Sequence, residues 1–194
     1  TNGYSLIRKV VAGQDLSAPV PELGESLKEA LLRPHRAYLK EFRLLWEAGV
    51  ELHAAAHITG GGLPENLPRA LPPGLGAEVR RGSWPIPPVF PYLQRLGDIP
   101  EEEMYRVFNM GLGMVLVLPQ EAAEEALKLV EGFLVGRVVP GEGVRLVWRR
   151  SGTSATGRRS GTPSGASRGT WTSPSPPWVS GRPSASPSAS AAAA

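Results

Sequence analysis

LGMVLVLPQEAAEEALKLVEGFLVGRVV, residues 112–139, contains the pattern that decides the fold of this chain. Its first part, residues 112–118, is a continuous apolar run bounded by Gly111 and Pro119. Such a run is too short to span a membrane and is typical of a strand buried on both faces. It therefore predicts the central strand of a sheet.

The residues that follow predict a helix and then two more strands. Residues 120–130 are amphipathic, with apolar positions recurring at helical spacing at Ala123, Ala126, Leu127 and Val130. A strand pair is expected next, at residues 133–139 and 143–148. Strands that alternate with helices predict a layered α/β domain with a mixed sheet.

Upstream, the chain predicts further helices and strands of ordinary length. In residues 40–48, Phe42, Leu45 and Trp46 share one helical face, and Gly49 suits the C-terminal cap. The other expected helices are residues 26–32, ending before Pro34, then 64–70, 89–96 and 100–108, and the other expected strands lie within 50–59 and at 76–80.

Composition changes sharply near residue 150. The first 150 residues hold 17 lysines and arginines and all 18 acidic residues, so the net charge of +3 comes from a tail with four arginines. Residues 149–194 are rich in Ser, Ala, Pro and Gly, which cannot build a core, and we expect a disordered tail. A native flexible tail and a frame-shifted one both fit, and we favour the frameshift. Resequencing that confirmed this reading frame would exclude it.

Several function classes are excluded or disfavoured by what the sequence lacks. It has no cysteine, so disulfides and thiolate chemistry are excluded, which fits a cytoplasmic protein. It has no apolar run of 18 residues, no signal peptide and no initiator Met, so we expect no membrane segment and a start within a longer gene product. Neither the Walker loop nor the dinucleotide glycine fingerprint occurs. The tail from residue 151 holds only four arginines and no lysine, which disfavours nucleic-acid binding through it.

HITGGGLPEN, residues 57–66, is the best candidate for a binding loop. It joins a predicted strand to a predicted helix, and Gly60, Gly61 and Gly62 let successive backbone N–H groups point at one anion. From spacing alone, a tight turn without a ligand is an equally good reading.

Three other features have plain structural alternatives. His53 and His57 lie four apart on a strand with no third ligand, so we expect no metal site there. The first residues, TNGYS, form either a second polar loop or a frayed end. Asn109 in FNMGLGM is read as part of a turn near the site rather than as a catalytic group.

Four long motifs together resemble the C-terminal domain of the aminoimidazole ribonucleotide synthase family, also called phosphoribosylformylglycinamidine cyclo-ligase. The resemblance covers residues 1–148, and related families share the glycine loop more readily than the rest. The motifs are TNGYSLIRKV, residues 1–10; HITGGGLPENLPRALPPGLGA, residues 57–77; SWPIPPVFPYLQRLGDIPEEEMYRVFNMGLGMVLVL, residues 83–118; and VVPGEGVRL, residues 138–146.

This resemblance implies a three-layer α/β/α domain with partial ferredoxin-like topology and mixed sheet. In such an enzyme it pairs with an N-terminal ATP-binding domain, absent here, that supplies most ligands for ATP and Mg²⁺ and the homodimer contact. The reaction closes the imidazole ring of formylglycinamidine ribonucleotide after ATP has phosphorylated the amide oxygen. The chain alone is expected to be inactive.

The resemblance also implies roles for individual residues. His57 and Thr59 are the catalytic candidates, and the matching positions for phosphate or substrate are Gly60, Gly61, Gly62, Asn66, Asn2, Gly3 and Ser5. No metal ligand is assigned in this chain. The alternatives are a stand-alone module that binds a phosphorylated metabolite and a domain of formylglycinamidine ribonucleotide synthetase.

Overall fold

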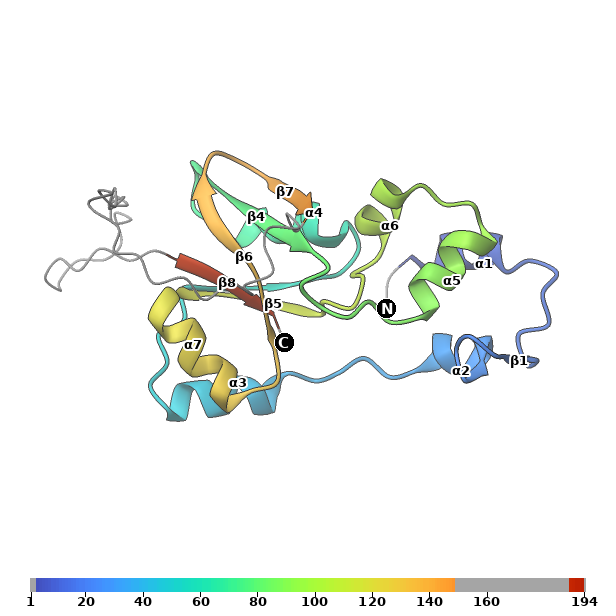
Figure 1. The fold of residues 1–194 in the computed structure, drawn as a ribbon, viewed down its shortest axis with the longest axis horizontal. Helices are drawn as coiled ribbons and strands as arrows, with labels where there is room; N and C mark the ends of the chain where they lie inside the picture. Colours follow the sequence, from blue (N-terminus) through green and yellow to red (C-terminus); the bar gives the residue numbers. More distant parts are fainter. Residues whose placement is uncertain (1–2, 149–188, 194) are drawn as a thin grey trace, which may run out of the picture.

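The structure, a computed structural model, describes residues 3–148 and the backbone of residues 189–193 (Figure 1). Its helices are α1 (Tyr4–Val10), α2 (Leu27–Leu32), α3 (Leu39–Glu47), α4 (Gly62–Asn66), α5 (Val89–Leu96), α6 (Glu101–Val107) and α7 (Gln120–Leu129), with a 3₁₀ turn, η1 (Pro68–Ala70). Its strands are β1 (Pro19–Val20), β2 (Glu25–Ser26), β3 (Ala54–His57), β4 (Leu75–Arg81), β5 (Met114–Pro119), β6 (Phe133–Pro140), β7 (Val144–Trp148) and β8 (Ala189–Ala193). The expected mixture of helices and strands is confirmed.

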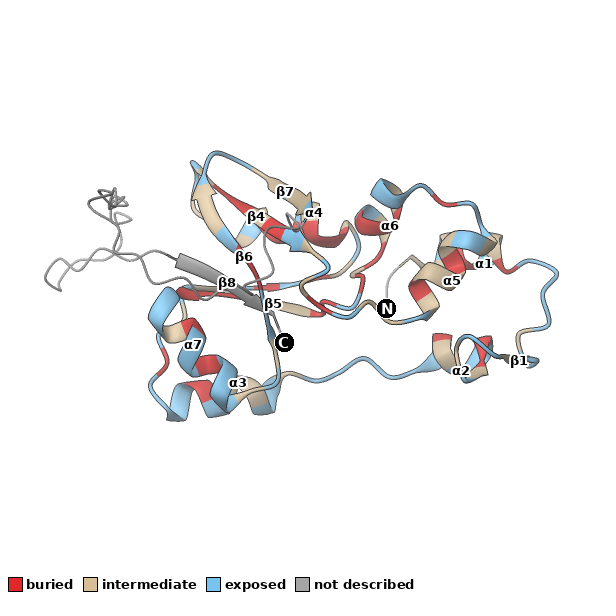
Figure 2. Ribbon diagram, in the orientation of Figure 1, coloured by how far each residue is buried: buried red, intermediate tan, exposed pale blue. Residues whose placement is uncertain are grey.

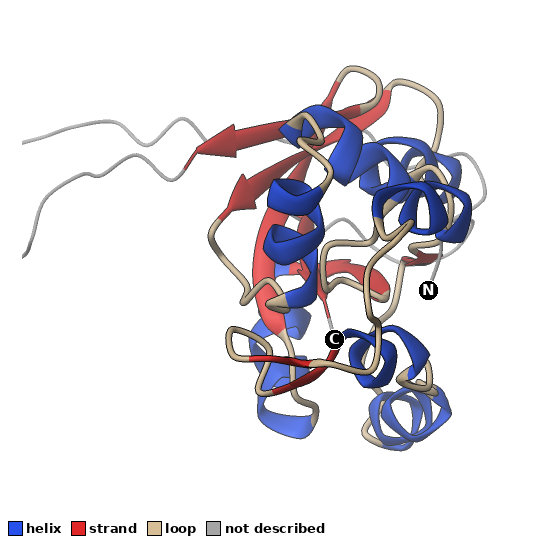
Figure 3. Ribbon diagram, turned by 90° about the vertical axis from the view of Figure 1, so that its right-hand side faces the viewer, coloured by secondary structure: helices blue, strands red, loops and turns tan. Residues whose placement is uncertain are grey.

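Six of these strands form one mixed sheet in the order β3-β5-β8-β6-β4-β7, and β1 and β2 form a separate small pair. Neighbouring strands of the large sheet are antiparallel except for β4 and β7, which are parallel. In the view turned by 90° (Figure 3), helices lie on more than one side of these strands. The mixed sheet predicted from the sequence is therefore present.

Strand β5, which is second in the strand order, is an interior strand buried on both faces, as its apolar run predicts, but it does not lie at the centre of the sheet. Val115 and Val117 belong to the larger core cluster, whereas Leu116 and Leu118 belong to a smaller cluster with residues of α3 and α7. Because side chains alternate along a strand, these two clusters lie on opposite faces of β5. Figure 2 shows the buried residues of α3 and α7, which lie side by side in Figure 1.

Local signals explain how two helices begin and end. Ser26 caps α2: its hydroxyl accepts from the backbone N–H of Glu29, and the Glu29 carboxylate accepts from the backbone N–H of Ser26. Gly49, with φ of 71°, follows α3, and its N–H donates to the carbonyl of Trp46. The predicted apolar face of α3 is only partly right, since Leu45 is buried but Trp46 is 61% exposed.

The expectation that the last two strands form a pair is wrong. β6 and β7 both pair with β4, which lies between them. The turn between β6 and β7 bonds to the start of β4 instead, through Gly141 N–H to the Gly74 carbonyl and Ala77 N–H to the Gly143 carbonyl. A turn of this kind places its strands on either side of a third strand, which local sequence does not reveal.

Two further boundaries differ from the expectation. The predicted helix at residues 64–70 is split into α4, which starts at Gly62, and η1, which starts at Pro68. Proline has no N–H to continue the α-helical bonding pattern, which explains the break. At the N-terminus, Tyr4–Val10 forms a helix whose Ile7 is buried, so this part is not frayed.

The expectation of a tail without regular structure is wrong for Ala189–Ala193, which forms β8 between β5 and β6. Composition arguments consider side chains, whereas this strand is held by backbone hydrogen bonds to two neighbours. Residues 149–188 and 194 lie outside the described residues. Within the described part of the chain, no helix has the length and hydrophobicity to cross a membrane.

Candidate functional site

The loop after β3 requires glycine at two positions. Gly61 and Gly62 have φ of 94° and 57°, in the left-handed region that favours glycine. A Cβ on Gly62 would overlap the carbonyl oxygen of Tyr105, and the carbonyl of Phe108 is also close. Close packing against α6 therefore fixes this loop, in addition to its backbone conformation.

Asn66 holds the loop from inside. It is 8% exposed, and its side-chain N–H₂ lies within 3.3 Å of the carbonyl oxygens of Thr59, Gly60 and Gly62. The Thr59 hydroxyl donates to the Asn66 side-chain oxygen over 3.2 Å. These bonds give both residues a structural role in the loop, and their direct contact with substrate stays a prediction.

The free backbone donors of the loop are fewer than the sequence suggests. The N–H of Gly62 donates to the carbonyl of Thr59 over 2.9 Å and closes the turn. Among the described residues, the N–H groups of Gly60 and Gly61 have no such backbone acceptor. The side chain of Glu65 lies over Gly61, and its carboxylate is also 3.8 Å from Arg69. An anion at this loop would therefore meet the N–H groups of Gly60 and Gly61, after Glu65 moves aside.

His57, the last residue of β3, pairs with a histidine far away in the sequence. Its Nε2 lies 3.2 Å from Nε2 of His35, and Tyr38 packs edge-on against His35 with ring centroids 5.8 Å apart. Burial and the nearby His57 lower the pKa of His35. Burial raises the pKa of the Tyr38 hydroxyl. The lowered pKa favours the neutral form of His35, and in this contact one ring nitrogen donates a hydrogen bond that the other accepts.

The N-terminal motif reaches the same part of the molecule. Gly3, with φ of 80°, precedes α1, and a Cβ on it would overlap Val107 and lie 2.6 Å from the ring of Phe108. Ser5 is exposed on the first turn of α1. Asn2 lies outside the described residues.

Asn109 makes the turn that the sequence indicates. Its side-chain oxygen accepts from the N–H of Gly111 over 3.0 Å, and its carbonyl accepts from the N–H of Leu112. The buried indole N–H of Trp84 donates to the carbonyl of Met110 and fixes the same turn. The turn leads directly into β5.

Three motifs that are far apart in the sequence thus meet around the end of α6. Phe108 lies against both Gly3 and Gly62, and the Asn109 turn follows it directly. The N–H of Ile58, one residue after His57, donates to the carbonyl of Gly113. The structure brings together most of the predicted site residues around one segment, from residue 105 to residue 113.

His53 and His57, four apart on one strand, have different partners. Nε2 of His53 lies 3.1 Å from the carboxylate of Glu51, whereas His57 meets His35. Within the described residues, no group of three or more histidine, aspartate or glutamate side chains is arranged to hold a metal ion. No metal ligand is assigned from the geometry.

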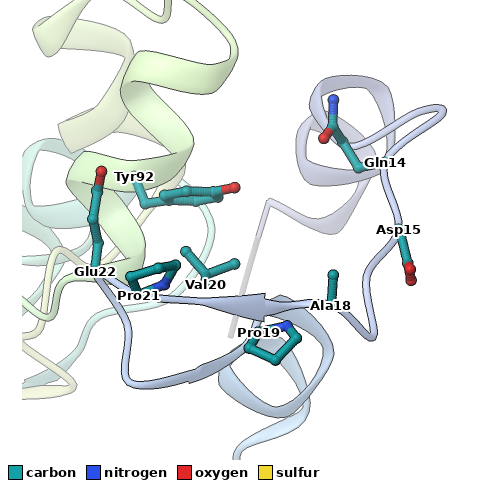
Figure 4. Close-up of a pocket in the computed structure, with 8 residues that line it drawn as sticks. All are labelled: Gln14, Asp15, Ala18, Pro19, Val20, Pro21, Glu22 and Tyr92. Atoms are coloured by element: carbon teal, nitrogen blue, oxygen red, sulfur yellow. The ribbon is translucent and has the colours of Figure 1, made fainter.

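A pocket elsewhere on the molecule does not suit a phosphate. Figure 4 shows Val20, Pro21 and the ring of Tyr92 on one side, with Asp15 across from them. Its lining contains the carboxylates of Asp15 and Glu22 but no cationic side chain, so an anion would be repelled; the other lining residues are Gln14, Ala18 and Pro19.

His35 and Tyr38 lie beside the candidate site residue His57, and sequence reasoning did not single them out. They lie between two predicted helices, and His35 meets His57 across 22 residues of sequence. No spacing rule links positions so far apart. A histidine and a tyrosine in a short polar linker, RPHRAY, were the only signal available.

Comparison with known proteins gives consistent matches. The sequence profile of the family described as "AIR synthase related protein, C-terminal domain" matches residues 1–149. The chain is 49% identical over 144 residues to the phosphoribosylformylglycinamidine cyclo-ligase of Nitrosococcus oceani, covering 72% of this chain and 40% of that protein. It is 44% identical over 152 residues to the enzyme of the same name from Bacillus subtilis, covering 74% and 44%. The chain thus spans less than half the length of these relatives.

Proposed function

Because this chain belongs to the family of AIR synthase related proteins, C-terminal domain, we propose that it is the substrate-side domain of an ATP-dependent cyclo-ligase of purine biosynthesis. The enzyme would close the imidazole ring of formylglycinamidine ribonucleotide. We also propose its finer features: a three-layer α/β/α arrangement with partial ferredoxin-like topology, a homodimeric full-length enzyme and a cytoplasmic location. Burial of β5 on both faces supports the layering.

The meeting of three motifs at residues 105–113 is the observation that carries this proposal. An amide oxygen is a poor leaving group, and phosphorylation by ATP converts it into a good one. Charge develops on the transferred phosphoryl group and on the amide, so the protein must place donors around it in fixed positions. A loop held by Asn66 and packed on Phe108 has the rigidity that this task needs.

The residues of this chain would bind and orient the substrate rather than hold the metal ion. We propose that the N–H groups of Gly60 and Gly61 donate to a phosphate or to the reacting end of the substrate. His57, exposed beside them and backed by His35, would donate or accept one proton there. The described residues contain no cluster fitted to Mg²⁺, so no step is derived through that ion in this chain.

Substitution of Gly60 tests the binding role without disturbing the fold. A Cβ on Gly60 would meet nothing within 4 Å, so Gly60→Ala leaves the protein intact but places a methyl group where a ligand must approach. We expect calorimetry with formylglycinamidine ribonucleotide to show affinity weakened about tenfold, the size expected for one charged hydrogen bond. Unchanged affinity in Gly60→Ala would contradict the anion-loop role.

A second substitution tests the proposed binding role of His57, and His53 provides the matched control. His57→Ala should weaken the same affinity. His53→Ala should not, because His53 lies four residues before His57 and its Nε2 contacts the carboxylate of Glu51 instead. Equal effects of the two substitutions would show that His57 has no special role.

Turnover tests the assignment of this chain to one half of the active site. The wild-type chain with ATP and formylglycinamidine ribonucleotide should give no ring-closed product. Product should form when the N-terminal portion of the Bacillus subtilis relative is added. Turnover by the chain alone would contradict the proposal that it supplies only one half of the active site.

A further inference from the structure

Strands β5 and β6 leave a place for one strand between them in the sheet, here called the slot, and β8 fills it. Both strands are antiparallel to β8, so they run parallel to each other, and α7 connects them. A strand–helix–strand unit split by one antiparallel strand is a known arrangement. Without an occupant, two rows of backbone N–H and C=O groups would face each other unpaired.

One wall of the slot, β5, is apolar on both faces of the sheet. In β5, Val115 and Val117 face the larger core, and Leu116 and Leu118 face the smaller one. All four are buried. A strand in such a position is normally a continuous run of Val, Ile and Leu, because both of its faces lie against other elements.

The segment found in the slot does not have that composition. Residues 189–193 read ASAAA, and alanine and serine lack the branched or aromatic side chains that favour strands. On β6, Phe133 and Leu134 pair with the end of β8 and stay 37% and 40% exposed. Larger neighbours in the slot would cover that apolar surface.

Residues 189–193 also lie outside the region that the family profile matches. The family profile ends at residue 149, and β8 begins 40 residues later. The relatives therefore share the walls of the slot but not residues 189–193 as part of the matched domain. They have more than half of their length outside the aligned region.

We propose that the slot between β5 and β6 is a strand-docking site with an exchangeable occupant. The fitting occupant is an extended segment of at least five apolar, mainly β-branched residues, supplied by the part of the cyclo-ligase polypeptide outside the matched domain. It binds antiparallel to both walls and displaces Ala189–Ala193. The source of the segment rests on the proposed function. Its extended, apolar and β-branched character follows from the geometry of the slot alone.

Variants of the full chain at Ala191, the middle of β8, test the exchange. Ala191 pairs with Val117 and Gly136, so Ala191→Pro removes a central N–H from the ladder and opens the slot. Ala191→Val should hold the native segment more firmly. The probe is a lysine-flanked synthetic peptide with the central run Val-Ile-Val-Ile-Val, and its matched control has Ala-Ser-Ala-Ala-Ala in the same flanks.

Fluorescence anisotropy of the labelled probe should give a clear order of affinities. We expect Ala191→Pro to bind it at least tenfold more tightly than the wild type, and Ala191→Val to bind it at least tenfold more weakly. Amide hydrogen exchange should slow at residues 115–119 when the probe binds. Equal affinity in the three chains, or equal affinity for the two peptides, would overturn the proposal, and Ala191→Val keeps the test valid if Ala191→Pro fails to fold.

Two further measurements fix the source of the occupant. Overlapping peptides that cover the unaligned part of the Bacillus subtilis relative should include a β-branched segment that competes with the probe, and failure of all of them would overturn the proposed source. A wild-type dimer that becomes monomeric in Ala191→Pro would show that the occupant is β8 of a second copy, and would also overturn it. No nucleotide substrate is used, so this result is independent of the turnover test.

Discussion

Two glycine-bearing turns of this molecule use the same backbone conformation for different reasons. Gly61 and Gly62, after β3, and Gly141 and Gly143, between β6 and β7, all have positive φ. A Cβ would collide with neighbouring atoms at the first two positions but would meet nothing within 4 Å at the last two. The first turn needs glycine for packing and conformation, whereas the second needs it for conformation alone.

The two turns also differ in the hydrogen bonds that hold them. The first is clamped by the buried side chain of Asn66, which reaches three loop carbonyls. The second is joined to the start of β4 by two backbone bonds, from Gly141 and to Gly143. A glycine-rich motif therefore marks a rigid, enclosed site only where surrounding elements pack onto it, and the comparison predicts how differently the two turns respond to substitution.

Gly62→Ala should give the largest effect. Its Cβ would overlap the backbone carbonyl of Tyr105, which cannot move without shifting α6. We expect a loss of more than about 3 kcal/mol in the free energy of unfolding, as for other substitutions that force backbone displacement. Urea denaturation measures it. A loss below about 1 kcal/mol would show that α6 yields easily and that the loop is not rigid.

The contrast between these turns also shows what sequence could and could not predict. The apolar run of β5 and the helical spacing of α7 are local patterns, and both elements formed where they were expected. The glycine triplet correctly indicated a turn after β3. Whether that turn was enclosed depended on Tyr105 and Phe108, more than 40 residues away, and no local pattern carries that information.

Long-range pairing accounts for the other failures. The insertion of β4 between β6 and β7, the contact of His57 with His35, and β8 in the central slot all join segments distant in sequence. The site was predicted as a set of motifs, and the resemblance to a family linked them. Their convergence on Phe108, and the use of the Gly62 N–H within the turn, required the structure.

Asn66→Ala should have the next largest effect. It removes the donor shared by three loop carbonyls in a buried place, so we expect a loss of about 2–3 kcal/mol in the free energy of unfolding. Asn109→Ala is the matched control, since Asn109 makes one side-chain bond in a partly exposed turn, to Gly111. Thermal denaturation of both variants gives the comparison, and a greater loss for Asn109→Ala would contradict the proposal that the buried Asn66 side chain holds the first turn.

Gly143→Ala should have a smaller effect than either. The new methyl group meets open space, so only the left-handed conformation at φ of 72° opposes it. That conformation costs an L-residue about 1–2 kcal/mol, and the lower entropy of the unfolded alanine chain offsets part of it. We expect a net loss of about 1 kcal/mol by urea denaturation. A loss equal to that of Gly62→Ala would remove the distinction between a packed and an open turn.

The smallest effect concerns the pH response next to the first turn. Burial lowers the pKa of His35, so the unfolded chain binds a proton more readily than the folded one. Stability should therefore fall as the pH drops through the ordinary histidine range near 6.5, and stop falling below the lowered pKa of the folded state. His35→Gln should flatten this part of the stability profile, measured by urea denaturation at a series of pH values. Near the second turn, the hydrogen bond from Arg137 and the charge of Arg145 lower the pKa of the Glu78 carboxyl. The contribution of Glu78 to the free energy of unfolding should therefore be lost only as the pH drops below about 4.5. Two separate pH ranges of stability loss would confirm that the first turn, unlike the second, lies beside an imidazole pair.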